Sequence, residues 1–298
     1  MSSPGPLQGG AAGAPLVLGL DIGGSSTRAR LSQGGRTLAE ATASGANVTT
    51  IDPEVVEERL RDVIGKLGSP LPAACCAGAA GSEVPAGKRR LEELLAMLFP
   101  GSRILVVHDA RLVLAAAGLE SGIALIAGTG SVAYARDTAG AEARFGGWGW
   151  LLGDEGGGAW IAREALRELM RRHEAGEPAG TLGGAMLNAT HTDDVLDATG
   201  RVQRHTEPGQ WAVFAGVVFE SCGTDPGAAR IIDHAAQELA LLAERAGAQL
   251  SIQGPVVMAG GLAVNFPDLV RRVQARIGPT RVLHQEPVAG AVRLAESL

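Results

Sequence analysis

Apolar and polar positions repeat along the chain with two different periods, which separate strands from helices. Residues 27–32 alternate strictly, which predicts a strand with one wet face. Residues 53–67 place apolar side chains three or four positions apart, after an Asp-Pro pair typical of a helix start. The same reasoning predicts strands over 16–20, 36–43, 73–79, 103–108, 122–127, 132–136, 255–259 and 281–284. It predicts further helices over 91–98, 110–119, 158–173, 226–246, 267–277 and 288–298.

This order of elements predicts an α/β fold with an internal repeat of topology. A meander of strands leads into β-α-β units in the first half, and the pattern then restarts at residue 122. We therefore expect an N-terminal domain over 16–115, completed by a returning helix at 286–298, and a C-terminal domain over 116–285. Residues 1–15 read as a disordered tail, and residues 176–209 read as a polar, irregular and mobile segment.

Two glycine-rich turns follow apolar runs and carry the chemistry of phosphate binding. Backbone N–H groups and small hydroxyl side chains in such turns surround phosphate oxygens, and an acid beside them can face a Mg²⁺ ion. Asp21 is that acid. The candidate phosphate-binding residues are Gly23, Gly24, Ser25, Ser26 and Thr27 in the first turn and Gly128, Thr129, Gly130 and Ser131 in the second. The pair predicts one nucleotide held between two similar halves, although each turn alone also fits an ordinary hairpin.

Asp109 is the candidate general base. It follows a buried strand, at the edge of an α/β sheet where ligands gather. A carboxylate there can accept the proton of a hydroxyl that attacks a phosphate. The alternative is that Asp109 only caps the helix that follows.

Composition limits the kinds of molecule that the protein is expected to bind and the compartment in which it is expected to work. The chain has 298 residues, 46% of them apolar and 19% charged, which is enough for about two domains. The net charge is −6 with no basic run, so nucleic acid is an improbable partner. No apolar run is long enough to span a bilayer, and the first residues lack the pattern of a signal peptide. The three cysteines, two of them adjacent, favour reduced thiols and a cytoplasmic protein with no metal site of zinc type.

Five segments, taken in order, resemble the actin/hexokinase/Hsp70 ATPase superfamily. They are Asp21–Thr27, His108–Ala110, Gly128–Ser131, Gly146–Gly156 and Met258–Leu262. More narrowly, they are similar to the N-acetylglucosamine kinase branch, which groups with the BadF/BadG/BcrA/BcrD ATPases. The resemblance covers the chain from about residue 16 to its end. It implies two ribonuclease H-like, or actin-like ATPase, domains with a cleft between them.

The resemblance also implies roles for individual residues. ATP and Mg²⁺ are the expected cofactors, with Asp21 toward the metal and Gly260 and Gly261 where adenine approaches the backbone. The base of the family lies in an Asn-Asp-Ala segment, whereas this chain has His108 before Asp109. The sugar site is implied for Asn47, Asp109, Thr129, Gly147, Trp148 and Asp154. Packing in the core is the alternative for Trp148 and Trp150.

The expected reaction is transfer of phosphate from ATP to the 6-hydroxyl of an amino sugar. N-acetylglucosamine is the first expectation for the sugar. Glucosamine is an alternative, because the segments Gly209–Trp211 and Cys222–Pro226 are similar to segments of compact glucosamine kinases. N-acetylmuramic acid is a further alternative. A more distant alternative is an ATP-driven activator of a dehydratase, which would need clustered cysteines. A non-catalytic sugar sensor or a chaperone would need further domains. The family also leads us to expect a homodimer.

Overall fold

The computed structural model describes residues 13–298, so most of the tail predicted over 1–15 lies outside the described residues. The chain forms two compact units. The first runs to Gly118 and resumes from Gln285 to Leu298, and the second is Leu119–His284. Among residues 13–298, no helix has the length and apolar character needed to cross a membrane.

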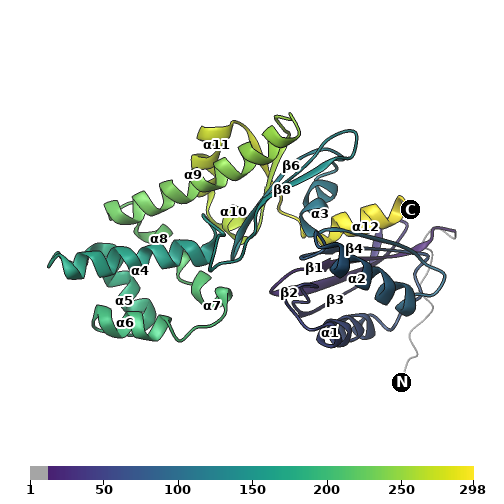
Figure 1. Ribbon diagram of the computed structural model, residues 1–298, viewed down its shortest axis with the longest axis horizontal. Coiled ribbons are helices and arrows are strands. Elements are labelled where there is room, and N and C mark those ends of the chain that lie inside the picture. The colour runs from purple at the N-terminus through teal and green to yellow at the C-terminus, as the bar shows by residue number, and fades with distance from the viewer. Residues whose placement is uncertain (1–12) are drawn as a thin grey trace, which may run out of the picture. The chain divides into compact units, whose positions relative to one another are not determined.

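The first unit is a five-stranded sheet with helices on both faces (Figure 1). Its strand order is β3-β2-β1-β4-β5, in which the first three strands form an antiparallel meander and β1, β4 and β5 are parallel. The elements are β1 (Leu16–Ile22), β2 (Ser26–Gln33), β3 (Arg36–Ser44), α1 (Pro53–Lys66), β4 (Ala74–Ala79), α2 (Pro85–Leu98), β5 (Arg103–His108), α3 (Asp109–Ala116) and α12 (Val288–Glu296).

Strand alternation decides which side chains reach each face of this sheet. Leu18, Leu20 and Ile22 of β1 pack into the core under α1 and α2. The intervening residues face α3 and α12, and a Cβ on Gly19 would come within 3.0 Å of Ala291 in α12. Asp21 belongs to this second set, so the fold brings it to the face that carries α3 and α12.

The second unit repeats the sheet and enlarges the helical layer. Its strand order is β10-β9-β6-β7-β8, again with an antiparallel meander and parallel pairing of β6, β9 and β10. The strands are β6 (Gly122–Ala127), β7 (Ser131–Arg136), β8 (Glu142–Gly146), β9 (Val256–Ala259) and β10 (Thr280–Val282). The helices are α4 (Gly158–Glu174), α5 (Gly180–Thr190), α6 (Val195–Val202), α7 (Pro208–Ala212), α8 (Ala215–Ser221), α9 (Pro226–Gln249), α10 (Gly261–Asn265) and α11 (Pro267–Ile277).

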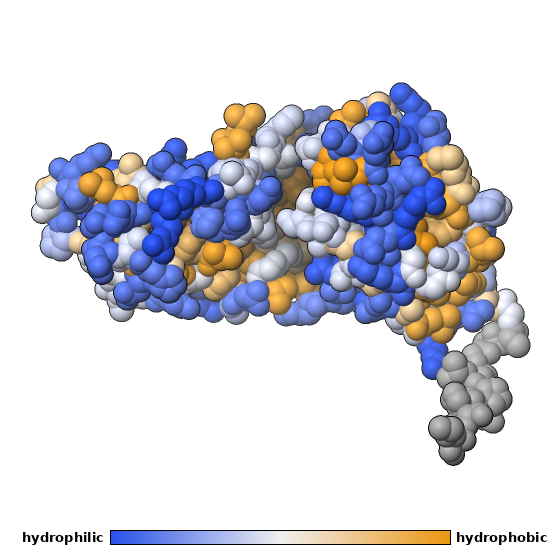
Figure 2. Space-filling view, turned by 90° about the horizontal axis from the view of Figure 1, so that it is seen from below, coloured by the Kyte–Doolittle hydropathy of each residue, from blue (hydrophilic) through white to orange (hydrophobic). Residues whose placement is uncertain are grey.

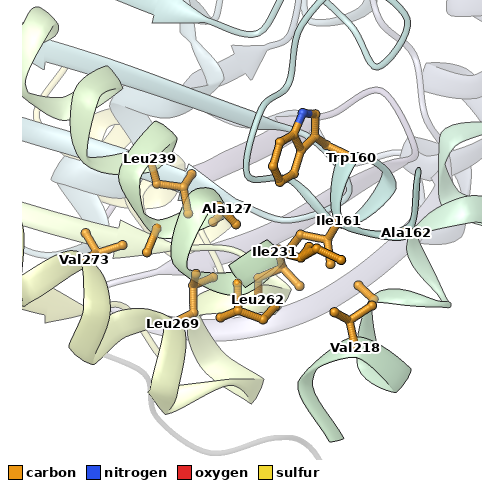
Figure 3. Close-up of a cluster of buried hydrophobic side chains, with 14 of the residues drawn as sticks. Ala127, Trp160, Ile161, Ala162, Val218, Ile231, Leu239, Leu262, Leu269 and Val273 are labelled. Atoms are coloured by element: carbon orange, nitrogen blue, oxygen red, sulfur yellow. The ribbon is translucent and has the colours of Figure 1, made fainter. Parts of the chain in front are cut away.

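Aliphatic side chains from these helices and the sheet make one continuous core. Figure 3 shows part of this cluster, with Trp160 and Ile161 from α4, Leu239 from α9, Leu262 from α10 and Leu269 from α11. Hydrophilic residues dominate the face of the molecule in Figure 2, on which apolar side chains form separate patches.

The prediction of an irregular segment over 176–209 is wrong. It contains α5 and α6, whose Leu182, Met186 and Val202 are buried in the core of the second unit. The Asp194 side chain caps α6 by accepting hydrogen bonds from Leu196 N and Asp197 N. Tertiary burial of a few apolar side chains therefore stabilises helices that the glycine-rich sequence alone does not predict.

Candidate active site

The turn between β1 and β2 is exposed at its tip and fixed at its base. Gly24 and Ser25 are exposed. Gly23 N donates to Ser26 O at 2.9 Å, and Ala46 N donates to Gly23 O at 3.1 Å. Any side chain on Gly45 would overlap the Gly24 carbonyl. The turn therefore has a defined conformation and an accessible tip, as a phosphate-binding turn requires.

Thr27 is oriented differently from the rest of the first turn. It is fully buried and pairs with Ile22, on the face of the sheet opposite to Asp21. Its Oγ1 has no hydrogen-bond partner among the described residues. The predicted roles of Gly23, Gly24, Ser25 and Ser26 involve the turn itself, whereas the Thr27 hydroxyl lies on the core side of β2.

Two carboxylates meet at the carboxyl ends of the parallel strands of the first unit. Ile22, Ala79 and His108 are in register across β1, β4 and β5, so Asp21 and Asp109 lie at the same edge. The pKa of Asp21 is raised to about 7, first by burial and then by the negative charge of Asp109, with a smaller contribution from Glu286. The positive charge of Arg28 acts in the opposite direction.

This pair of acids fits a hard divalent cation. A buried carboxylate whose ionised form is disfavoured by a second carboxylate gains most from a nearby positive charge. Magnesium binds through one or two carboxylates and keeps several waters and phosphate oxygens. Within residues 13–298, no group of three or more His, Cys, Asp and Glu side chains forms a closed metal cage. Asp21 beside Asp109 therefore suits Mg²⁺ bound together with a nucleotide.

Asp109 is the first residue of α3, and His108 is the N-cap. The Asp109 Oδ1 atom accepts a hydrogen bond from Ala110 N at 2.8 Å and lies 2.9 Å from His108 Nδ1. The His108 ring is nearly buried, and its Nε2 lies 3.8 Å from Glu83 Oε2. Asp109 thus contributes to the helix start, as the capping alternative expects, and the His108 ring lies between Asp109 and Glu83.

Asn47 lies in the loop after β3, beside Gly81, where any Cβ would approach its Oδ1 to 2.7 Å. This oxygen accepts hydrogen bonds from Thr49 N at 2.9 Å and Thr49 Oγ1 at 2.8 Å. The Asn47 carbonyl therefore holds its own loop, and its amide Nδ2 is the group left for a ligand.

The turn between β6 and β7 is anchored by the start of α4. Gly158 N donates to Gly128 O at 2.8 Å, and Ala159 N donates to Thr129 O at 3.0 Å. Ser131 Oγ donates to Glu155 O at 2.6 Å. The N–H groups at the start of α4 therefore take up the carbonyl groups of Gly128 and Thr129, while Gly128 N donates to Gly130 O at 3.0 Å within the turn.

The Asp154 side chain packs on the turn between β6 and β7. It has a left-handed backbone, with φ of 57°, and accepts hydrogen bonds from the N–H groups of Gly149 and Ser131. Burial raises its pKa above the ordinary value, and these hydrogen bonds act against that shift. A Cβ on Gly130 would collide with the Asp154 carboxylate, whose Cγ would be 2.6 Å away. Gly130 is therefore required for Asp154 to pack on the turn.

The two tryptophans of the glycine-rich block have different surroundings. Trp148 is 72% exposed, with the Arg144 guanidinium 5.6 Å from its ring centroid. Trp150 lies against Trp211 with ring centroids 5.7 Å apart. Gly147 joins this block to the turn, since Gly147 N donates to Ser131 O at 2.9 Å. Core packing therefore does not explain Trp148, which leaves its ring available to a ligand.

Gly260 and Gly261 follow β9 and lie beside the second turn, because β6 and β9 are parallel neighbours. Gly260 has φ of 97°, and a Cβ there would come within 3.1 Å of Gly128 N. The second unit thus brings together the predicted residues 128–131, 147–154 and 260–261 at the carboxyl ends of β6 and β9.

The sequence of the whole folded region matches one protein family. The profile of the BadF/BadG/BcrA/BcrD ATPase family aligns with residues 18–295. The chain belongs to the BadF/BadG/BcrA/BcrD ATPase family. This confirms the resemblance stated from the motifs.

Relatives of this BadF/BadG/BcrA/BcrD ATPase include curated kinases and solved structures. It is 32% identical over 264 residues to a protein of Clostridium acetobutylicum named N-acetylmuramic acid/N-acetylglucosamine kinase, covering 84% of this chain and 86% of the relative. A solved structure of a proposed N-acetylglucosamine kinase from Porphyromonas gingivalis is 23% identical, with a TM-score of 0.78 over 94% of this chain and 99% of the other. The ROK hexokinase of Thermus thermophilus is 16% identical, with a TM-score of 0.52 over 95% and 97% of the chains. These structures show that the fold is the actin-like ATPase fold, as predicted.

Sequence reasoning missed several charged neighbours of Asp21 and Asp109 in this BadF/BadG/BcrA/BcrD ATPase. Arg28 Nε pairs with Glu286 Oε1 at 3.0 Å, and Glu286 comes from the returning C-terminal segment. His108 lies against the candidate base, and Glu83 lies against the other end of the His108 ring. For His108, its position next to Asp109 in the sequence was a usable signal. Glu83 and Glu286 gave none, because the fold alone brings their segments to this edge.

The cysteines of this BadF/BadG/BcrA/BcrD ATPase lie in two separate places. Cys75 and Cys76 are buried in β4, and burial raises both thiol pKa values, that of Cys76 to about 12. Cys222 follows α8 in the second unit. Buried thiols with raised pKa values stay protonated, so these two are structural side chains.

Proposed function

We propose that this chain transfers the γ-phosphate of ATP to the 6-hydroxyl group of an amino sugar. N-acetylglucosamine is the first choice, and glucosamine and N-acetylmuramic acid are the alternatives. The observation that carries the proposal is the pair of Asp21 and Asp109 at one sheet edge in a member of an ATPase family. The name of the Clostridium acetobutylicum relative supports an amino sugar as the acceptor.

Each group of residues has a part in this reaction. The turn residues Gly23–Ser26 and Gly128–Ser131 bind the phosphates of ATP through their N–H groups, and Gly260 and Gly261 admit the adenine. Asp21 would hold Mg²⁺, which would neutralise phosphate charge. Asp154, Asn47, Thr129, Gly147 and Trp148 orient the sugar. Asp154 suits this role because an ionised acceptor makes directional hydrogen bonds to hydroxyl groups.

Asp109 accepts the proton. The 6-hydroxyl O–H bond breaks as its oxygen bonds to the γ-phosphorus, and the bond from that phosphorus to the bridging oxygen of ADP breaks. The proton then leaves Asp109 for solvent. Since this transfer needs an acceptor alcohol, we expect ATP hydrolysis without sugar to be slow.

A coupled assay of ADP release tests the proposal. Glucosamine, N-acetylglucosamine, N-acetylmuramic acid, N-acetylmannosamine and glucose are compared with ATP alone, and ¹³C and ³¹P NMR locate the phosphate on the product. We expect one acetylated or free amino sugar to stimulate ADP release strongly and to carry phosphate at carbon 6. If no sugar raises ADP release above the rate with ATP alone, the proposal fails. The expected homodimer is a separate prediction, which sedimentation equilibrium checks.

A further inference from the structure

The loop over residues 147–153 carries Trp148 on a backbone whose glycines give it unusual freedom. Gly147 and Gly149 have φ of 66° and 89°, in the left-handed region that favours glycine. Trp148 is 72% exposed, so burial does not fix its ring. The direction of the ring therefore depends on the polar contacts that hold this loop.

Two arginines from regular elements hold the loop on either side of Trp148. Arg144, in β8, donates from Nη2 to Gly147 O at 2.5 Å. Arg163, in α4, donates from Nη1 to Trp150 O at 2.9 Å. Because one arginine belongs to a strand and the other to a helix, the backbone before and after Trp148 is tied to regular structure of the second unit.

Arg144 also reaches the Trp148 ring. Its Cζ atom lies 5.6 Å from the ring centroid, within the range of a cation–π contact. The guanidinium fills the space beside Gly147, where a Cβ would lie 2.5 Å from Nη2. One guanidinium therefore contacts both the backbone before Trp148 and the indole itself.

The charge of Arg144 acts on Asp154 as well. Burial raises the pKa of the Asp154 carboxyl, and hydrogen bonds from backbone N–H groups together with the positive charge of Arg144 oppose that shift. Arg144 therefore lies among three residues of the proposed sugar site, which are Gly147, Trp148 and Asp154.

We propose that Arg144 is a positioning residue that sets the direction of the Trp148 ring, so that the indole is in place before the sugar binds. This inference rests on the proposed function, since it needs Trp148 to contact the acceptor sugar. The C–H groups of a sugar ring present apolar surface, which an indole buries. A ring that is already oriented loses less side-chain entropy when the sugar binds. Arg144 itself takes no part in the transfer of phosphate.

Steady-state kinetics of matched variants test the positioning role. We expect Arg144→Ala to raise KM for the sugar by about 5- to 20-fold while kcat and KM for ATP change less than about twofold, because the lost contacts support sugar binding and do not involve the reacting atoms. Arg144→Lys keeps a cation and a donor, so its KM should lie between those of wild type and Arg144→Ala. The matched control is Arg136→Ala, which removes an arginine of the same hairpin that donates to Glu120 O at 2.7 Å and should leave KM for the sugar unchanged.

A double-mutant cycle with Trp148→Ala separates an action through the ring from general damage to the loop. If Arg144 acts through Trp148, then Trp148→Ala and the double variant raise KM for the sugar to the same extent. Wild-type KM in Arg144→Ala, a fall in kcat as large as the rise in KM, or additive effects in the double variant would each overturn the inference. Thermal melting separates lost binding from lost folding. If Arg144→Ala does not fold, Arg144→Gln replaces it in the cycle, because glutamine keeps an N–H for the Gly147 carbonyl and lacks the charge.

Fluorine NMR of the indole gives a readout that does not depend on a substrate. In protein labelled with fluorotryptophan, Trp148→Phe identifies the Trp148 resonance, and we expect Arg144→Ala to shift and narrow it while Arg136→Ala does not. If Arg144→Ala moves this resonance but no sugar is phosphorylated, the proposed function fails while the contact between Arg144 and Trp148 stands. If a sugar is phosphorylated and the Trp148 resonance does not respond to Arg144→Ala, the positioning inference fails alone.

Discussion

The two units have the same sheet topology but different residues at the carboxyl ends of their parallel strands. In the first unit this edge carries the acids Asp21 and Asp109, with Arg28 and Glu286 beside them. In the second unit the corresponding strands β6 and β9 end in glycine turns, over which Asp154 packs. One scaffold therefore carries a pair of acids at this edge in the first unit and a single acid packed over a glycine turn in the second.

The two units also differ in the role of their buried charged side chains. The second unit contains the extra helices α5 and α6, and its most buried ion pair joins α4 to the start of α9. Arg172 donates to both oxygens of Asp225, at 2.9 and 2.7 Å, and both side chains are nearly or fully buried. Charge is thus structural in the helical layer of the second unit, whereas Asp21 and Asp109 of the first unit have the catalytic roles proposed above.

The largest effect is expected where the first unit supplies the base. Asp109→Asn should lower kcat by about 10²- to 10⁴-fold while ATP affinity changes little, because the amide cannot accept the hydroxyl proton. Steady-state kinetics with the best sugar and calorimetry of ATP binding measure the two quantities. Asp52→Asn is the matched control, since this N-cap residue makes no side-chain capping hydrogen bond. Near wild-type turnover in Asp109→Asn would remove this residue from the mechanism.

The second-largest effect is expected for the ion pair between Arg172 and Asp225 in the second unit. Asp225→Ala leaves Arg172 buried without its main partner and removes the cap of α9, so we expect a loss of about 3–5 kcal/mol in the free energy of unfolding. Urea denaturation measures it. Asp62→Ala, which breaks an exposed pair with Lys66 in α1, should cost less than about 1 kcal/mol.

The same pair predicts a pH dependence. Hydrogen bonds from Arg172, together with those from Leu182, Gly227 and Ala228, lower the pKa of Asp225 from its ordinary value of 3.8. A lowered carboxyl pKa stabilises the fold above the unfolded-state value and loses that contribution as pH falls below it. Wild type should therefore lose stability below about pH 4 more steeply than Asp225→Ala. Parallel acid curves for the two proteins would contradict this.

All strands except β8, and the glycine turns of both sheets, could be predicted from sequence because local signals determine them. Alternation placed the residues of β2, and the glycine pairs marked the turns after β1 and β9. β8 and the helices α5 and α6 were not located, because their sequences lack a clear period and their stability comes from burial in the second core. Local pattern therefore predicted the sheets and missed what tertiary packing alone supports.

The candidate site, like the fold, was predictable from sequence only where a local motif marks its residues. The motifs named Asp21, Asp109 and the glycines, each next to a strand end. The groups that set their chemistry are charged residues contributed by other segments, such as Glu83 and Glu286. No spacing in the sequence relates position 286 to position 21, so only the fold brings these residues together.

The third effect compares the glycine turns of the two units. Gly130→Ala puts a Cβ into the Asp154 carboxylate, so we expect a loss of about 2–3 kcal/mol in the free energy of unfolding. Gly24→Ala in the first turn meets no atom within 4 Å and should change stability by less than about 0.5 kcal/mol. Thermal and urea unfolding measure both variants. Equal losses would mean that the two turns are equally packed and that Asp154 does not restrict position 130.

The smallest effect has the opposite sign and concerns Asp21. Because its pKa is raised to about 7, ionisation of Asp21 favours the unfolded chain, whose carboxyl ionises near 3.8. The resulting destabilisation is absent below pH 4, grows up to about pH 7 and is then constant. One pKa unit corresponds to about 1.4 kcal/mol, and partial solvent exposure reduces the total, so Asp21→Asn should stabilise the protein by about 1–2 kcal/mol at pH 8.

Urea denaturation of wild type and Asp21→Asn at pH 3.5, 5.5 and 8 measures this gain. Its increase with pH separates a buried acid from a general packing effect, which would be the same at each pH. Mg²⁺ with ADP should raise the melting temperature of wild type more than that of the variant, since a cation beside Asp21 compensates the charge that Asn lacks. If Asp21→Asn is less stable than wild type at pH 8, the buried Asp21 carboxylate does not lower the free energy of unfolding of the protein. The contrast between the acids of the first unit and the structural ion pair of the second would then fail.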